Sequence, residues 1–195
     1  LVISCEDTEE LYGRKQLAAR SQISMSRIAD GEISDQERED AERVIETTND
    51  PLDIVRVRNK SVVNVCRWIR RAGAEGATLV AVDYLQAIKP DREFMQRKSA
   101  VDYVLNEVIS AAATANVALI LASQLARMEK GTKAREPELY DLKESGDIEN
   151  CATYVVFAWQ KRADAFGRIL GKVSKNKSGG FRGEIDGWQR DRETE

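Results

Sequence analysis

The chain has 195 residues, 42% of them hydrophobic and 32% charged, and its formal net charge is −3. A chain of this length can bury one good core, so a single domain spanning residues 1–195 is predicted. The sequence has no histidine, and its three cysteines lack paired spacing. This composition excludes histidine-based triads and the usual zinc sites, and it favours reduced core cysteines in a cytoplasmic protein. No apolar run approaches the roughly 20 residues of a membrane span, so no membrane association is expected.

Charge is unevenly distributed along the chain. Residues 1–50 hold 13 acidic and 6 basic side chains, whereas residues 51–195 hold 20 and 24. Two basic clusters stand out: Arg127, Lys130, Lys133 and Arg135, then Lys172, Lys175, Lys177 and Arg182. Solvated loop charge is the ordinary explanation of such clusters. The alternative is a local track for a phosphate backbone.

The apolar residues predict short strands that alternate with amphipathic helices. The predicted strands are residues 1–3, 52–57, 79–86, 117–122 and 153–159, with a last pair near 167–174 and 181–188. The predicted helices are residues 7–22, one that begins at Ser34, then 61–71, 99–115 and a short one at 142–151. Asp7 with Glu10 and Ser34 with Glu37 are predicted capping boxes, and Gly73 is expected to end the third helix. This alternation implies a mostly parallel sheet, with antiparallel strands at one edge.

The run Leu-Val-Ala-Val-Asp-Tyr-Leu-Gln at residues 79–86 is almost wholly apolar and places the acid Asp83 near its carboxyl end. Its length and flanks predict a strand buried on both faces. Ligands collect at the carboxyl ends of parallel strands, where a carboxylate can hold Mg²⁺ against nucleotide phosphates, directly or through water. The alternative is that Asp83 only caps a buried strand.

Five segments occur together in the order and spacing of one family. They are Ser-Cys-Glu at 4–6, Val-Asp-Tyr-Leu-Gln at 82–86, Ser-Gln-Leu-Ala-Arg at 123–127, Asp-Leu-Lys-Glu-Ser-Gly-Asp-Ile-Glu at 141–149 and Ser-Lys-Asn-Lys-Ser-Gly at 174–179. In these segments the chain resembles the C-terminal RecA-like ATPase domain of DnaB-type replicative DNA helicases. The resemblance implies an α/β fold with a RecA-like P-loop NTPase core: a mostly parallel twisted sheet flanked by helices, with antiparallel strands at the C-terminal edge. It also implies ATP and Mg²⁺ as cofactors.

The resemblance gives three strand-end residues catalytic roles. Glu6 matches the glutamate that orients and polarises the attacking water, a role suited to a carboxylate beside the γ-phosphate. Asp83 matches the Walker B acid that positions Mg²⁺, and Gln124 matches a polar sensor of the γ-phosphate. The ordinary alternatives are a charge near a helix start for Glu6 and a strand-end amide for Gln124.

Other positions match contacts to DNA and to a neighbouring subunit. Lys143, Glu144 and Gly146 match a loop that contacts single-stranded DNA, and Arg127 belongs to a polar segment, residues 126–138, that would face the same channel. Phosphate contacts carry no sequence information, as a translocating motor requires. The alternatives are helix capping by Glu144 and a turn at Gly146.

Lys175 and Lys177 match a basic pair that reaches the nucleotide of the next subunit. The family usually has arginine where Lys177 stands. Lysine keeps the charge but loses the planar fork that binds phosphate bidentately, so more of the role would fall to Lys175 or Arg182.

A P-loop of the form G-x-x-x-x-G-K-[ST] does not occur in the sequence; the one Gly-Lys pair, Gly171–Lys172, continues with Val173. A P-loop supplies backbone N–H groups and a lysine to the phosphates. In the family it lies just upstream of the strand with which this chain begins. We therefore expect either an N-terminally truncated motor domain or a degenerate paralogue, and we expect the 195 residues alone to be inactive.

The leading hypothesis is the motor domain of a replicative helicase that hydrolyses ATP at subunit interfaces and moves along single-stranded DNA. The resemblance implies a homo-oligomer, a hexameric ring in the full-length protein, with a primase and a helicase loader as partners. It would act in the cytoplasm, or in a host cytoplasm if viral. The alternatives are a RecA-like recombinase or recombination ATPase, and a non-catalytic assembly or DNA-binding subunit without a P-loop.

Overall fold

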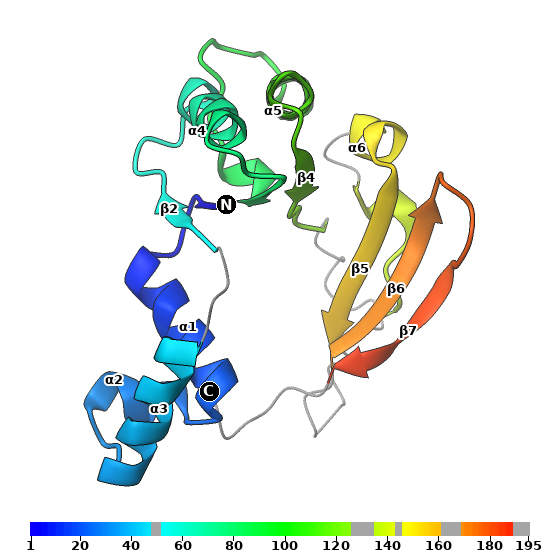
Figure 1. Ribbon diagram of the computed structural model, residues 1–195. Helices are drawn as coiled ribbons and strands as arrows, with labels where there is room; N and C mark the ends of the chain where they lie inside the picture. The colour runs from blue at the N-terminus through cyan, green and yellow to red at the C-terminus, as the bar shows by residue number, and fades with distance from the viewer. Residues whose placement is uncertain (48–51, 126–134, 143–145, 161–168, 189–195) are drawn as a thin grey trace.

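The computed structural model describes all residues except 48–51, 126–134, 143–145, 161–168 and 189–195 (Figure 1). The strands are β1 (Val2–Ser4), β2 (Ile54–Arg56), β3 (Leu79–Asp83), β4 (Ala118–Leu121), β5 (Tyr154–Gln160), β6 (Ile169–Asn176) and β7 (Gly183–Trp188). The helices are α1 (Glu9–Ser21), α2 (Met25–Asp30), α3 (Asp35–Thr47), α4 (Val62–Ala74), α5 (Arg97–Ala115) and α6 (Gly146–Cys151), with 3₁₀ turns η1 (Leu85–Ala87) and η2 (Leu139–Leu142). The predicted alternation is confirmed. The short helix α2 was missed because six residues carry too little periodicity.

The first four strands form a parallel sheet in the order β2-β1-β3-β4. In its register Ser4 lies opposite Asp83, and Val82 lies opposite Leu121. Since all four strands run the same way, their carboxyl ends meet at one edge of the sheet. The α/β fold predicted from the sequence is therefore present.

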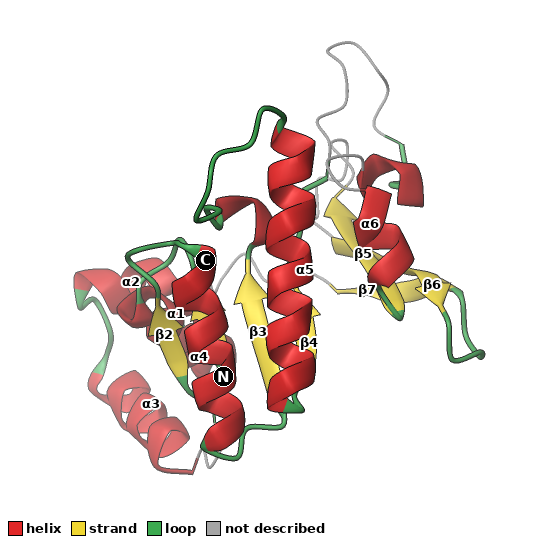
Figure 2. Cartoon of the chain, turned by 90° about the horizontal axis from the view of Figure 1, so that it is seen from above, coloured by secondary structure: helices red, strands yellow, loops and turns green. Residues whose placement is uncertain are grey.

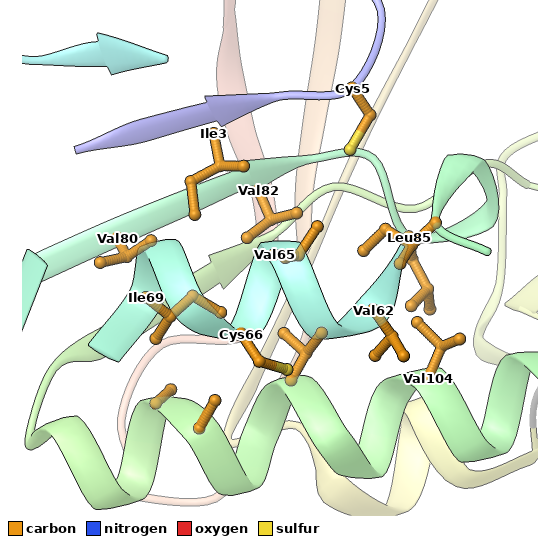
Figure 3. Packing of buried hydrophobic residues seen from close by; sticks show 14 of the residues in the cluster. Ile3, Cys5, Val62, Val65, Cys66, Ile69, Val80, Val82, Leu85 and Val104 are labelled. Atoms are coloured by element: carbon orange, nitrogen blue, oxygen red, sulfur yellow. The ribbon is translucent and has the colours of Figure 1, made fainter. Parts of the chain in front are cut away.

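Helices α4 and α5 lie side by side over one face of this sheet (Figure 2). Both helices present apolar stripes, so their buried side chains interlock with those of β1 and β3. Figure 3 shows this packing, in which Ile69 of α4 and Val80 of β3 are completely buried. The members of this core are Ile3, Cys5, Val57, Val62, Val65, Cys66, Ile69, Ala72, Val80, Val82, Leu85, Ile88, Val101, Val104, Leu105, Val108, Ala111 and Ala112.

The opposite face of the parallel sheet is more open. Leu79 of β3 is 44% exposed and Ile120 of β4 is 56% exposed. The residues next to them in each strand face the helices and are less exposed. The prediction that residues 79–86 form a strand buried on both faces is therefore wrong. The strand predicted at residues 117–122 is likewise exposed on one face. An apolar run gives no periodicity from which a half-exposed strand could be recognised.

The prediction that this helix ends at Gly73 is wrong, because α4 continues to Ala74. A Cβ atom at Gly73 would lie 2.5 Å from the carbonyl oxygen of Ala115 and 2.8 Å from its Cβ. Glycine is needed at this position because the end of α5 approaches the backbone of α4 closely, and it serves as a packing residue rather than as a helix stop.

The helix starts confirm one capping box and correct the other. Thr8, not Asp7, caps α1, since the Leu11 amide donates to Thr8 Oγ1 at 3.1 Å. Ser34 and Glu37 exchange the expected bonds at the start of α3, with Ser34 N to Glu37 Oε2 at 2.8 Å and Glu37 N to Ser34 Oγ at 3.3 Å. The Arg27 guanidinium of α2 donates twice to the same carboxylate. The bonds from Arg27 have the largest effect and those from Ser34 the next largest. Together they lower the pKa of the Glu37 carboxyl to about 2.

Strands β5, β6 and β7 form a separate antiparallel sheet. The sequence predicted antiparallel strands at the C-terminal edge but assigned them to the same sheet as the parallel strands. A smaller apolar cluster of Leu142, Val155 and Phe157 supports this second sheet, and Ile148 of α6 packs against both clusters. Helix α6 therefore contacts the cores of both sheets.

Two of the three cysteines, Cys5 and Cys66, are buried as predicted, whereas Cys151 is exposed, which corrects the prediction. Burial raises the pKa of the Cys5 thiol to about 11, so this sulfur stays protonated and unreactive at neutral pH. Within the described residues, no helix is both long and apolar enough to cross a membrane.

Candidate functional site

The carboxyl edge of the parallel sheet gathers the three predicted catalytic residues. Glu6 follows β1, Asp83 is the last residue of β3, and Gln124 follows β4. Strands β1 and β4 flank β3, and the amide of Cys5 donates to the Asp83 carbonyl at 2.7 Å. The structure thus brings the residues that the sequence selected to the edge where parallel sheets bind ligands.

The turn that carries Glu6 is fixed by a buried serine. Ser4 is completely buried, and its Oγ donates to the Asp7 carbonyl at 2.8 Å and accepts from the Glu6 amide at 3.3 Å. These bonds hold the backbone at the strand end while the Glu6 side chain is exposed. An exposed carboxylate on a fixed backbone can act on a water molecule or a phosphate at this edge.

The Asp83 carboxylate is held by a residue that the sequence did not indicate. The hydroxyl of Tyr12, on α1, donates to Asp83 Oδ2 at 2.6 Å. Burial, and then this bond, raise the pKa of Tyr12 above its ordinary range, so the phenol stays protonated and acts as a donor. No sequence motif points to Tyr12, because the contact joins residues 71 positions apart.

Gln86, in η1, joins the ends of β3 and β4. Its Oε1 accepts from the Gln124 amide at 3.0 Å, and its Nε2 donates to Ser123 Oγ at 2.8 Å and to the Gln124 carbonyl at 3.4 Å. The Gln86 side chain therefore bonds the backbone N–H and C=O groups of Gln124, as a neighbouring strand would, and fixes this part of the backbone. Gln86 lies inside the Val-Asp-Tyr-Leu-Gln segment, which was the available sequence indication, but its role was not among those predicted.

The donor set at this edge fits magnesium only as part of a larger complex. Within the described ranges, no group of three or more cysteine, aspartate or glutamate side chains could hold a metal ion by itself. Mg²⁺ prefers oxygen ligands and commonly binds through one or two carboxylates together with water and substrate phosphates. Asp83 can supply such a carboxylate, because it is only partly buried and because Tyr12 binds Oδ2 and leaves Oδ1 for the ion.

The predicted DNA-contacting residues are mostly outside the described residues. Lys143, Glu144 and Arg127 belong to that undescribed part, whereas Gly146 is the first residue of α6. Arg135, a described member of the first basic cluster, forms a two-pronged ion pair with Asp141, at 2.8 and 2.6 Å. Because its charge is paired with a mostly buried carboxylate of the same chain, Arg135 is neither a solvated loop charge nor available to a phosphate backbone in this conformation.

The two predicted trans-acting lysines lie at the other sheet, Lys175 within β6 and Lys177 just after it (Figure 1). Lys175 Nζ donates to the carbonyl of Glu149, and Lys177 Nζ donates to the carbonyl of Asn150. Both acceptors are in the last turn of α6, where cations satisfy free carbonyls and the helix dipole. In this conformation the lysines bind their own chain rather than reaching outward.

Comparison with known proteins identifies the family. The DnaB-like helicase C terminal domain family matches residues 1–181. The replicative DNA helicase DnaB of Mycobacterium intracellulare is 28% identical over 170 residues, which are 86% of this chain and 29% of that protein. The replicative DNA helicase DnaC of Bacillus subtilis is 30% identical over 105 residues, covering 53% of this chain and 23% of that protein. The chain thus spans less than a third of the length of these relatives.

Solved structures agree on the fold. A DnaB-like replicative helicase studied for its interactions with primase superposes with a TM-score of 0.82 at 20% identity, covering 94% of this chain and 46% of that one. A second solved structure, described as an ATPase domain, gives the same TM-score and identity, and 69% of that chain is covered. With Glu6, Asp83 and Gln124 at one sheet edge and a family match over residues 1–181, this chain belongs to the family of DnaB-like helicase C-terminal domains.

Proposed function

We propose that this chain is the ATP-hydrolysing motor domain of a replicative DNA helicase that moves along single-stranded DNA. The observation that supports this proposal most directly is the meeting of Glu6, Asp83 and Gln124 at the carboxyl edge of three adjacent parallel strands. Catalysis of phosphoryl transfer depends mainly on positioned charged and polar groups. This edge of the sheet presents two carboxylates and an amide.

In the proposed mechanism Glu6 orients the attacking water and accepts its proton. Asp83 would hold Mg²⁺, directly or through water, and the bound ion would neutralise charge on the nucleotide phosphates. The Gln124 amide contacts the γ-phosphate, and its backbone is held by Gln86.

We further propose that the full-length protein is a hexameric ring with ATP bound between subunits, and that a primase and a helicase loader are its partners. The relatives named above are replicative helicases, and one solved neighbour was described with primase. Lys143, Glu144, Gly146 and Arg127 would contact the DNA backbone, where lysine, arginine and backbone amides bind phosphate without sequence preference.

Lys175 and Lys177 would reach the nucleotide of the neighbouring subunit only after leaving the carbonyls of α6. Helix α6 begins at Gly146, within the proposed DNA-contacting loop, and ends where these lysines bind. A movement of α6 is therefore the proposed route by which DNA contact frees the lysines.

Hydrolysis requires a phosphate-binding loop that the 195 residues do not contain. We propose that the chain hydrolyses ATP only together with a P-loop-bearing segment. The test compares the chain extended by such a segment with its Glu6→Gln and Asp83→Asn variants, using Glu10→Gln as the control. Glu10 is exposed, lies in the first turn of α1 and pairs with Arg14.

We expect each site variant to reduce DNA-stimulated hydrolysis by about 100-fold or more. A positioned base such as Glu6 contributes about that much, and a metal ion held by Asp83 would contribute several kcal/mol of charge stabilisation. The control variant should retain full activity. Hydrolysis near the wild-type rate in Glu6→Gln and Asp83→Asn would refute the proposed roles. No hydrolysis by the extended wild-type chain would instead favour a non-catalytic assembly subunit.

A further inference from the structure

We propose that Tyr12 is a positioning residue for the metal-binding carboxylate, holding Asp83 by one oxygen so that the other faces the metal ion. This inference rests on the role of Asp83 in the proposed function, and it assigns a task to a side chain outside every motif of the chain. Its basis is the 2.6 Å contact between the Tyr12 hydroxyl and Asp83 Oδ2.

The side chain of Tyr12 belongs to a helix start that is held from several sides. Lys15 Nζ lies 5.6 Å from the centre of the Tyr12 ring and pairs with Asp7 Oδ2 at 2.7 Å. The start of α1 is bound to a further strand, because the Arg56 amide of β2 donates to Glu9 Oε1 at 3.0 Å. The donor is therefore part of a helix fixed to the sheet, not a mobile surface side chain.

The contact selects which oxygen of Asp83 remains for a metal ion. A carboxylate that is free to rotate can offer either oxygen or both. When Oδ2 accepts a bond from a fixed hydroxyl, the rotation of the group is restricted and Oδ1 is left as the available ligand. Hydrogen bonds to metal-binding carboxylates orient them, and loss of such a partner commonly lowers metal affinity by about 10–100-fold.

The same helix also connects the two acidic residues of the site. Helix α1 begins at Glu9, shortly after Glu6, and Tyr12 in its first turn reaches Asp83. Glu6 and Asp83 are thus connected both through the β1–β3 ladder and through α1. Removing the hydroxyl should loosen Asp83 while leaving the ladder intact.

The test is a Mn²⁺ titration, in the presence of ADP, of the chain extended by a P-loop-bearing segment, because the site is expected to bind the ion together with nucleotide phosphates. The readout is the paramagnetic loss of the Asp83 amide NMR signal. Tyr12→Phe removes only the hydroxyl. Tyr103→Phe is the matched control, because the hydroxyl of Tyr103, on α5, also donates to an aspartate, Asp91 Oδ1, at 2.8 Å. Asp83→Asn tests the metal role of the carboxylate itself.

We expect the midpoint for the Asp83 signal to rise about tenfold in Tyr12→Phe and to stay unchanged in Tyr103→Phe. An unchanged or lower midpoint in Tyr12→Phe, with loss of the response in Asp83→Asn, would overturn this inference but leave the proposed metal role standing. The same response in Asp83→Asn as in wild type, or none in wild type, would overturn both.

A second measurement covers the case in which Tyr12→Phe does not fold. The ring carbon that bears the Tyr12 hydroxyl is followed by ¹³C NMR during a Mg²⁺ titration of the wild-type extended chain with ADP. If Mg²⁺ binds Asp83, this ¹³C signal and the Asp83 amide signal should shift with the same midpoint of Mg²⁺ concentration. A Tyr12 signal that stays constant while the Asp83 amide moves would overturn the inference.

Discussion

The close approach of α4 and α5 at Gly73 predicts opposite effects for the same substitution at two helical glycines. Gly73→Ala adds a methyl group 2.5 Å from the Ala115 carbonyl oxygen and 2.8 Å from its Cβ. The helices must separate to accept it, at a cost of about 1–3 kcal/mol for overpacking. Alanine's better helix propensity offsets about 1 kcal/mol of this cost. The expected net loss in the free energy of unfolding is therefore about 1 kcal/mol.

Gly13→Ala in α1 is the matched control, since a Cβ there meets no atom within 4 Å. Only the propensity gain of about 1 kcal/mol remains, so this variant should be stabilised. In a chain of this size each kcal/mol shifts the thermal midpoint by about 2–4 °C, which circular dichroism resolves. A Gly73→Ala variant that melts at or above the wild-type temperature would refute the packing argument.

Three further predictions follow from the side-chain contacts. Gln86→Leu removes the bridge to the Gln124 backbone, so hydrogen exchange of the Gln124 amide should accelerate by about tenfold or more; an unchanged rate by NMR would contradict the bridging role. Asp141→Asn weakens the ion pair with Arg135 and should lower the thermal midpoint by about 2–4 °C or more, roughly the effect of 1 kcal/mol. An unchanged midpoint would show that this ion pair does not stabilise the fold. Because the folded pKa of Glu37 is about 2, against 4.5 ordinarily, its contribution to stability is complete above pH 4.5 and is lost as pH falls towards 2. The difference in urea midpoint between wild type and Glu37→Gln should shrink across that pH range; a constant difference would contradict this assignment.

The positions of the strand-end residues could be predicted from the sequence because local pattern and topology determine them. Apolar runs separated by amphipathic helices imply parallel strands, and parallel strands bring their carboxyl ends together. Glu6, Asp83 and Gln124 accordingly lie at one edge of the sheet. The capping box at α3 was predictable for the same reason, since its bonds span only three residues.

The sequence could not reveal features that depend on contacts between distant segments. The bond from Tyr12 to Asp83 joins α1 to β3, and the packing of Gly73 on Ala115 joins two helices. Gly73 resembles a helix stop when only its own segment is considered. The exposure of Leu79 and Ile120 likewise depends on which sheet face is covered, which no strand sequence specifies.

The lysine pair illustrates a third limit. The family resemblance assigned Lys175 and Lys177 an outward role, yet both side chains bind the last turn of α6. A long flexible lysine can bind either kind of partner, and here both side chains bind carbonyls of their own chain. A sequence motif identifies the side chain but not its conformation.

The most direct test of the proposed motor function is ATP hydrolysis by the 195-residue chain, with and without Mg²⁺ and single-stranded DNA, beside the same chain extended by a P-loop-bearing segment. We expect no hydrolysis by the chain alone and Mg²⁺-dependent, DNA-stimulated hydrolysis by the extended chain. DNA-stimulated hydrolysis by the chain alone would contradict the proposal that a P-loop-bearing segment is required. An extended chain that binds ATP but never hydrolyses it would contradict the roles given to Glu6 and Asp83.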